Sequence, residues 1–158
     1  MDVIVDAFWR SVYRLGYPCA QAYWRLVGKL ARGANIAVWH DGRLLCVRQS
    51  YRHGLTFPGG GLNWRETAID AARRELREEV GFDLALEDFR RRSLLAYQCD
   101  GRPVEDEIFE VRLREPLQPI IDNREIVWAG FLEPAAIRAS RMQRSLRLYL
   151  ERFGHAET

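Results

Sequence analysis

The sequence has few of the features that mark secreted, membrane-spanning or zinc-binding proteins. Its 158 residues include three cysteines, Cys19, Cys46 and Cys99, which are odd in number and widely separated. This arrangement fits neither a disulfide framework nor a zinc knuckle, so we expect reduced, mostly buried thiols. No run approaches the roughly 18 uninterrupted apolar residues of a spanning helix, and no basic leader precedes an apolar core at the N-terminus. We therefore expect a cytoplasmic protein without a transmembrane segment.

Lysine and net charge are also scarce. Lys29 is the only lysine, so arginine supplies nearly all of the positive charge, and 24 basic residues are nearly balanced by 22 acidic ones. A formal net charge of +2 gives no global field that would attract a nucleic-acid polymer or a membrane. Arginine suits phosphate and carboxylate partners, although a bias in the genome explains its abundance equally well. We expect a small-molecule partner recognised by local charge, and no nucleic-acid polymer.

No internal repeat, low-complexity segment or linker divides the chain. The length is that of one ordinary domain, and a hydrophobic content of 47% is enough for one sizeable core. We predict a single domain at residues 33–158, with a helical extension at residues 1–32 packed on it. A homodimer stays open as an alternative to a monomer.

The first thirty-two residues repeat apolar side chains at helical spacing, in two sets on either side of Gly16 to Pro18. Because glycine and proline interrupt helices, we predict two short amphipathic helices. Their polar faces carry five basic residues: Arg10, Arg14, Arg25, Lys29 and Arg32. A basic face beside Trp and Tyr suits a membrane surface or a partner. A helical pair that covers an edge of the main domain explains the same pattern, and we favour it.

From Asn35 onward the pattern is that of strands around a central helix. Residues 35–40 and 43–49 are β-rich and are separated by Asp41-Gly42, a strong hairpin signal. Further strands are predicted at 93–99, 105–113 and 124–132, and a closing helix at 142–153. Residues 67–80 are rich in helix formers and predict a helix that Gly81 ends. Residues 57–61, Phe-Pro-Gly-Gly-Gly, predict a loop ahead of that helix.

Three glutamates of the central helix, Glu75, Glu78 and Glu79, lie on one face at i, i+3 and i+4 spacing. Like charges this close destabilise a helix by roughly a few tenths of a kcal/mol per pair unless a cation lies among them. Hard oxygen ligands suit Mg²⁺ or Mn²⁺. A solvated acidic face paired with neighbouring arginines explains the helix alone equally well. The glycines at 59–61 favour the metal site, because they let backbone carbonyls approach a ligand without side-chain obstruction.

The spacing of these residues resembles the Nudix box. Gly60 is followed after five residues by Glu66, and after seven more by Arg74-Glu75-Leu76-x-Glu78-Glu79-x-Gly81-Phe82. Every fixed position is present, and Phe82 stands where the family usually has an aliphatic residue. The match covers residues 60–82 and implies an α+β fold. That fold is a Nudix-type α/β/α sandwich around a mixed β-sheet, preceded in this chain by the N-terminal amphipathic helices.

The resemblance implies a metal site and a reaction. Glu75, Glu78 and Glu79 would ligate Mg²⁺ or Mn²⁺, assisted by the carbonyl of Gly60. The implied activity is metal-dependent hydrolysis of a phosphoanhydride bond in a nucleoside diphosphate linked to another moiety. Nucleotide sugars, dinucleotides, dinucleoside polyphosphates and nucleoside triphosphates all remain candidate substrates.

Further roles follow from the same resemblance. Arg74 would orient the glutamates through charge-assisted hydrogen bonds, with Glu66 as its partner. Glu78 is our choice of general base, because the family takes this base from the box in some members and from a later loop in others. Glu125 lies where several members carry an additional metal-binding glutamate, but a surface carboxylate is an equally good interpretation.

Substrate recognition has to come from outside the box. Arg48, Arg52 and His53 precede the glycines and are candidates for phosphate or sugar contacts, although plain surface positions explain them too. Four aromatic residues on or near the predicted strands are candidates to stack a base or to fill the core: Tyr51, Phe57, Tyr97 and Phe109. Tyr97 stands where some ADP-ribose-cleaving relatives have proline, which disfavours ADP-ribose. The acidic run at 105–107 is expected to be solvated.

Two alternatives belong to other functional classes. One is a catalytically idle Nudix-like module that senses a nucleotide or binds a protein through the N-terminal helices. The intact glutamates argue against it. The other is isomerisation of a prenyl diphosphate, which would require a catalytic cysteine beside the site. Cys46 and Cys99 lie on predicted strands without a recognisable surrounding motif.

Overall fold

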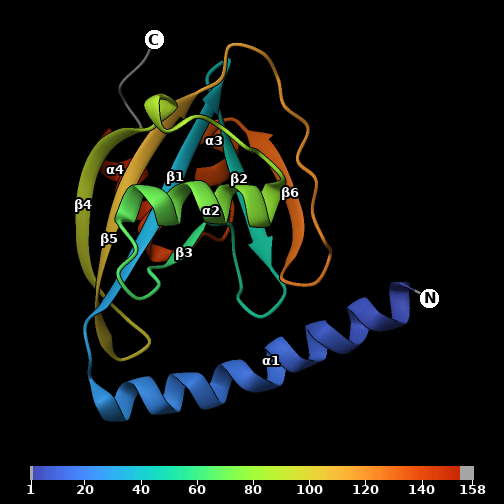
Figure 1. The fold of residues 1–158 in the computed structure, drawn as a ribbon, viewed down its shortest axis with the longest axis vertical. Coiled ribbons are helices and arrows are strands. Elements are labelled where there is room, and N and C mark those ends of the chain that lie inside the picture. Colours follow the sequence, from blue (N-terminus) through green and yellow to red (C-terminus); the bar gives the residue numbers. More distant parts are fainter. Residues whose placement is uncertain (1, 154–158) are drawn as a thin grey trace.

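A computed structural model describes residues 2–153 of the chain (Figure 1). Its helices are α1 (Asp2–Val27), α2 (Ala68–Val80), α3 (Pro134–Arg138) and α4 (Arg144–Phe153), with a 3-10 turn at Leu86–Asp88. Its strands are β1 (Ala31–His40), β2 (Arg43–Gln49), β3 (Gly59–Gly61), β4 (Arg90–Cys99), β5 (Arg102–Arg112) and β6 (Ile126–Leu132). The predicted strands and the closing helix are confirmed to within a few residues. Residues 154–158 of the predicted domain lie outside the described part.

The six strands form one mixed sheet. Its order is β4-β5-β1-β2-β6, and β3 pairs with β1 beside that path. Strands β1 and β5 run parallel, whereas the other pairs are antiparallel. Asp41 and Gly42 have φ of 47° and 69°, the left-handed conformations that a two-residue hairpin requires, so the predicted hairpin is confirmed. Asp100 and Gly101 repeat this turn between β4 and β5.

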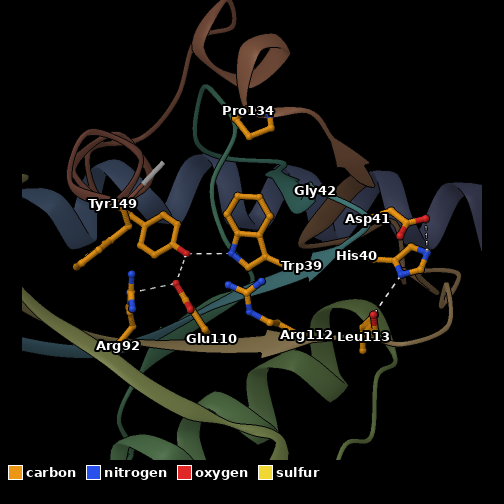
Figure 2. Close-up of a pocket in the computed structure, with 11 residues that line it drawn as sticks. Trp39, His40, Asp41, Gly42, Arg92, Glu110, Arg112, Leu113, Pro134 and Tyr149 are labelled. Atoms are coloured by element: carbon orange, nitrogen blue, oxygen red, sulfur yellow. Dashed lines mark hydrogen bonds and ion pairs between the residues drawn. The ribbon is translucent and has the colours of Figure 1, made fainter. Parts of the chain in front are cut away.

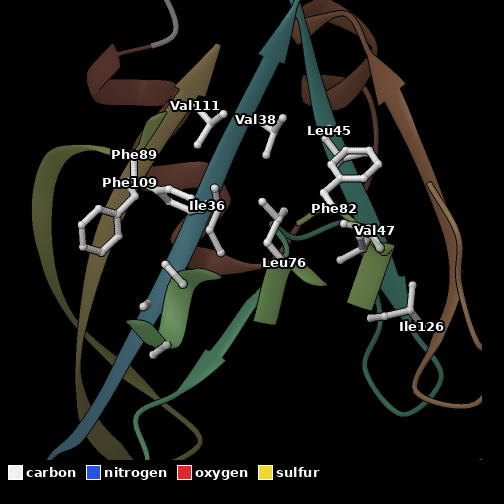
Figure 3. Close-up of a cluster of buried hydrophobic side chains, with 14 residues drawn as sticks. Ile36, Val38, Leu45, Val47, Leu76, Phe82, Phe89, Phe109, Val111 and Ile126 are labelled. Carbon is white, nitrogen blue, oxygen red and sulfur yellow. The ribbon is translucent and has the colours of Figure 1, made fainter. Parts of the chain in front are cut away.

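Helices cover both faces of the sheet. Ile36, Val38 and Phe109 lie on the face toward α2 and pack with Leu76, as Figure 3 shows. Ala37, Leu44 and Ile108 point to the opposite face. Helix α4 covers this face through Leu146, Tyr149 and Leu150. This alternation follows from the two-residue period of a strand. The predicted α/β/α sandwich around a mixed sheet is therefore confirmed.

The N-terminal segment corrects one prediction, because α1 is a single helix and not two. Pro18 lies inside it, where the missing N–H and the ring cost about 3 kcal/mol in a helix interior. Contacts on either side of Pro18 hold the helix together: Tyr17 and Gln21 both donate hydrogen bonds to the carboxylate of Asp100. In Figure 1, α1 crosses below the lower ends of the strands, next to the loop that joins β4 to β5.

Two smaller predictions are also corrected. The glycines at 59–61 form a short strand, because Gly59, Gly60 and Gly61 pair with Asn35, Ala34 and Gly33 of β1. Only one of the three free cysteines is buried, since Cys19 is exposed and Cys99 is half-buried. Within residues 2–153, no helix is long and apolar enough to cross a membrane.

Candidate active site

Helix α2 carries the acidic cluster and is capped at both ends. Thr67 precedes it in an extended conformation, and its hydroxyl accepts a hydrogen bond from the N–H of Asp70 at 3.3 Å. Gly81 follows with φ of 76°, a left-handed conformation that side chains disfavour, and its N–H donates to the carbonyl of Arg77 at 3.0 Å. The predicted end at Gly81 is confirmed, so the position of each glutamate on the helix is defined.

Arg74 lies at the centre of the hydrogen bonds in this region. Its Nε and Nη2 donate to the two oxygens of Glu66 at 2.8 and 2.9 Å, which is a bidentate pair. Its Nη1 donates to Glu75 Oε1 at 2.6 Å and to Glu78 Oε2 at 3.3 Å. Nη2 also donates to the Gly61 carbonyl at 3.1 Å. One guanidinium therefore links the start of α2, two of its glutamates and β3.

Glu66 is held as an anion by these bonds. The hydrogen bonds from Arg74, opposed by partial burial and assisted by the N–H of Asn63 at 2.8 Å, lower the pKa of Glu66 to about 2. Glu66 and Glu75 in turn raise the pKa of Arg74 above its ordinary value. The pair is therefore charged throughout the neutral range and fixes the loop between β3 and α2.

Glu79 and Glu75 are acidic side chains in an environment that disfavours their charge. Glu79 is 7% exposed and accepts the N–H of Gly59 at 2.9 Å. Burial, together with the charges of Glu75, Glu125 and Glu78, raises its pKa well above the ordinary value despite that hydrogen bond. Burial also raises the pKa of Glu75, against the effect of Arg74. A cation among these side chains would offset the repulsion.

The donor set fits a hard divalent cation, although the ligands are not yet gathered. Among residues 2–153, no three His, Cys, Asp or Glu side chains already converge as metal ligands would. Glu75 is held by Arg74, and Glu125 accepts the hydroxyl of Tyr51 at 2.8 Å. The available groups are carboxylates and carbonyls, which suit Mg²⁺ or Mn²⁺. At Gly60 a Cβ would overlap the carboxylate of Glu75, so only glycine allows this approach.

These groups line one side of a cleft of about 670 Å³ at the β3 end of the sheet. A volume of this order is typical of small-molecule sites, roughly 300–1,000 Å³. Its acidic side is formed by Glu75, Glu78 and Glu125, whereas Glu79 lies beneath the surface against Gly59. The remaining walls come from α1, β1, β4, β5, α4 and the loops between strands, and they include Tyr17, Asn35, Tyr51, Arg52, Tyr97, Asp100, Arg102, Asp106 and Ser145.

A buried polar group at the inner end of the cleft was not expected. Asp106 is buried and accepts hydrogen bonds from Tyr97 at 2.5 Å and from Asn35 at 2.8 Å. The prediction that residues 105–107 are simply solvated is wrong for Asp106. Burial raises its pKa, while the two hydrogen bonds act in the opposite direction. Strand alternation was the available signal, because Asp106 shares a face with the core residue Ile108.

A second unexpected group joins α1 to the cleft. Arg52 donates to the Tyr17 hydroxyl and to the carboxylate of Asp100. Tyr17 in turn donates to Asp100 at 2.6 Å, and Gln21 donates to its other oxygen at 2.8 Å. Burial first and then the Asp100 bond raise the pKa of Tyr17 to about 12, so its hydroxyl stays protonated. Helix α1 thus forms part of the cleft wall.

The predicted recognition residues fall in three places. Arg52, Tyr51 and Tyr97 line the cleft. Arg48 does not, since its guanidinium lies 5.7 Å from the ring of Trp128 and it lines an adjoining hollow with His53. Tyr51 and Arg52 border both hollows. Phe57 and Phe109 lie in the core, so the alternative prediction that they fill the core and do not stack a base is confirmed.

Another pocket, of about 190 Å³, lies away from the glutamates (Figure 2). There Trp39 Nε1 donates to the Tyr149 hydroxyl at 2.9 Å, which donates to Glu110 at 2.5 Å. Arg92 pairs with the same carboxylate at 3.3 Å. These polar atoms satisfy one another where α4 packs on the sheet, so they explain packing and supply no arrangement for catalysis.

Known proteins resemble this chain over most of its length. Nudix hydrolase 13, mitochondrial, from Arabidopsis thaliana is 32% identical over 120 residues, which are 68% of this chain and 59% of that protein. The chain thus spans less than two thirds of that relative. An RNA pyrophosphohydrolase from Xanthomonas campestris pv. campestris is 49% identical over 41 residues, 26% of this chain and 20% of that one.

The fold is also that of solved structures. A bifunctional NMN adenylyltransferase/ADP ribose pyrophosphatase from Francisella tularensis, complexed with AMP and an Mn ion, matches with a TM-score of 0.69 at 18% identity. The match covers 88% of this chain and 47% of that chain. The family model described as the NUDIX domain matches residues 29–153. Because that match covers most of the sequence, this chain belongs to the NUDIX domain family, as residues 60–82 predict.

Proposed function

We propose that this chain is a divalent-metal-dependent pyrophosphohydrolase that cleaves a phosphoanhydride bond in a nucleotide-like diphosphate. The observation that carries the proposal is the placement of Glu75 against Gly60 and of Glu79 against Gly59 of strand β3, with Glu125 lining the same cleft and Glu75 held by Arg74. The names of the Arabidopsis and Xanthomonas relatives, a hydrolase and a pyrophosphohydrolase, support this class of reaction. We expect the reaction in the cytoplasm, although the Arabidopsis relative is named mitochondrial.

The metal ligands in this proposal are Glu75, Glu78 and Glu79, with Glu125 and the Gly60 carbonyl as further oxygen donors. When bound, Mg²⁺ or Mn²⁺ neutralises charge on the diphosphate and lowers the pKa of a water molecule. The Mn ion named with the Francisella structure is consistent with this choice. Glu79 has an anchored oxygen, because the Gly59 N–H holds it at 2.9 Å.

The side chains of this protein then divide the remaining tasks. Arg74 and Glu66 act as positioning residues, since their bidentate pair fixes the guanidinium that holds Glu75. Glu78 is the proposed base. Its carboxylate is 55% exposed, and its bond to Arg74 is long at 3.3 Å, so it is held less tightly than Glu75 and Glu79 and is the best placed of the three to accept a proton from water.

The substrate is proposed to lie along the cleft with its diphosphate toward the glutamates. Arg52 is already oriented by Tyr17 and Asp100, and its charge suits a phosphate oxygen. Tyr97 and Tyr51 present aromatic surface near the inner end and the rim. A longer substrate, such as a dinucleoside polyphosphate, would extend past Tyr51 toward Arg48 in the adjoining hollow.

A screen of nucleotide sugars, dinucleotides, dinucleoside polyphosphates and nucleoside triphosphates with Mg²⁺ or Mn²⁺ tests the proposal by the phosphate products formed. Chelation is expected to abolish turnover.

Glu79→Gln is expected to lower kcat at least about 100-fold, because the amide keeps an oxygen for the Gly59 N–H but loses the charge. Glu87→Gln, on the exposed turn at Leu86–Asp88, is the matched control. Unchanged turnover in Glu79→Gln contradicts the metal assignment, and no turnover of any substrate favours the idle module.

A further inference from the structure

Helix α1 meets the domain with its polar side. Arg10 donates to the carbonyl of Asn123 at 2.6 Å, and Arg14 donates to that of Ser50 at 3.0 Å. Asp6 pairs with Arg124 at 2.9 Å, and the ring of Tyr13 stacks on that of Tyr51 at 5.8 Å. Together with Tyr17 and Gln21, these contacts place one polar stripe of the helix against the loops around the cleft.

The opposite side of α1 is an apolar stripe that faces outward. Its residues are spaced alternately by three and four positions, the 3.5-residue period of a helix-pairing surface. We name this set the α1 seam: Val5, Phe8, Val12, Leu15, Cys19, Ala22 and Leu26. All seven are exposed, and the exposed fraction reaches 75% at Leu15 and 88% at Leu26. Trp9, Tyr23 and Val27 border the seam and are exposed as well.

Such an orientation is the reverse of the usual one. Amphipathic surface helices turn their apolar side to the core, whereas the seam of α1 has no cover within the described chain. Large aromatic side chains present about 150–250 Å² each, so the seam and its borders expose on the order of 800 Å² of mostly apolar surface. An exposed patch of that size marks an interaction surface.

We propose that a second copy of this chain covers the α1 seam, with the two α1 helices packed against each other across a two-fold axis. The exposed area matches the roughly 800 Å² per partner that a stable dimer buries. The seam contains no charged residue, so two identical copies meet without like-charge repulsion. The seven-residue repeat lets side chains of one helix fit between those of the other.

Charge also distinguishes a second copy from a lipid surface. A helix that lies on anionic lipid needs lysine or arginine beside its apolar face. In α1, Arg10 and Arg14 point to the domain and bind the carbonyls of Asn123 and Ser50. The side chain of Arg25 lies against Gly101 in the turn between β4 and β5, so it also points to the domain. The three arginines of α1 are therefore all directed away from the seam.

The mass of the full-length protein in solution is the direct test, by light scattering and sedimentation over a range of concentrations. Wild type is expected at twice 18.4 kDa. Leu15→Glu combined with Leu26→Glu is expected to raise the dissociation constant at least about 100-fold, because pairing would bury unpaired charges. Ile120→Glu is the control, because Ile120 is 74% exposed but lies outside α1. It is expected to stay dimeric.

Two further measurements show whether a change in mass reflects lost pairing or a misfolded variant. Circular dichroism should show that the double variant keeps its helices, because the polar contacts of α1 are untouched. In wild type, maleimide labelling of Cys19, read by peptide mass spectrometry, should slow as concentration rises, since pairing covers this exposed thiol. A wild-type mass of one copy, or a double variant that stays dimeric, overturns the proposal. A flotation assay with phosphatidylcholine and phosphatidylglycerol vesicles covers the remaining outcome. If the wild type is a single copy and floats with these vesicles, the proposal is also overturned and the seam is assigned to lipid binding.

Discussion

Helices α1 and α2 are both amphipathic, yet they present opposite faces to the rest of the molecule. Helix α2 packs Leu76 and Val80 into the core and turns Glu75 and Glu78 to the cleft. Helix α1 turns Tyr17 and Gln21 inward and leaves Leu15 exposed. The difference lies in what each helix meets. An apolar sheet face lies under α2, whereas carbonyls and the Asp100 carboxylate at the ends of strands lie above α1. An amphipathic pattern therefore predicts two faces without predicting which one the protein covers.

The comparison is tested most strongly by shortening one leucine on each helix. Leu76→Ala is expected to lower the free energy of unfolding by about 2–5 kcal/mol, because Leu76 is fully buried and the cavity cannot refill. Leu15→Ala is expected to change it by less than about 0.5 kcal/mol in dilute protein, where copies are separate. Urea unfolding followed by fluorescence measures both values. Equal losses would show that α1 and α2 are packed alike.

A smaller effect is expected when the guanidinium of Arg74, which orients Glu75 on α2, is removed. Arg74→Ala should lower kcat about 10- to 100-fold with little change in KM, because Glu75 loses the bond that holds it. Arg77→Ala, on the exposed side of the same helix, is the matched control and should stay within about twofold of wild type. Steady-state kinetics at saturating Mg²⁺ separates the two constants. A change in KM alone would place Arg74 in substrate binding and not in orientation.

A substitution on α1 should instead weaken substrate binding. Tyr17→Phe removes the donor to Asp100 and the acceptor for Arg52, each worth about 1 kcal/mol. We expect KM to rise roughly fivefold while kcat is kept, because the glutamates are untouched. Activity measured across substrate concentrations checks this split. A fall in kcat with unchanged KM would mean that α1 contributes to the chemical step.

The smallest expected effect concerns pH and the entry to α2. Arg74 lowers the pKa of Glu66 from 4.5 to about 2, so the stabilisation from this pair is complete above pH 4.5. It is lost as pH falls from 4.5 toward 2. Unfolding of wild type and Glu66→Gln should therefore differ by about 1 kcal/mol at neutral pH and converge in acid. A difference that stays constant down to pH 2 would contradict the pairing.

The parts predicted from sequence are those whose signals lie close together in the chain. Thr67 and Gly81 delimit α2, and Asp41-Gly42 delimits a hairpin, through contacts that span a few residues. The box residues are similar, because Glu66 and Arg74 are eight positions apart and bond directly. Their placement around one cleft follows from local geometry together with one strand pairing.

The parts that escaped prediction depend on distant partners. The direction of α1 is set by Ser50, Asp100 and Asn123, which lie 36 to 113 positions from the residues they bond. Asp106 is buried because Asn35 and Tyr97 lie beside it on β1 and β4. Strand alternation assigns Asp106 to a face but contains no information about which side chains stand across from it. Its role in the cleft could only be seen once the strands were paired.

The glycines of β1 and β3 have a practical consequence for anyone who wishes to redesign this protein. A Cβ at Gly33 would overlap the carboxylate of Asp106, and one at Gly60 would overlap that of Glu75, so a side chain at either position would have to displace a carboxylate of the cleft. Selection from randomised libraries should return glycine at both positions whatever substrate is offered. A change of substrate specificity has to be introduced at Tyr17, Arg52 and Tyr97, whose side chains border the cleft.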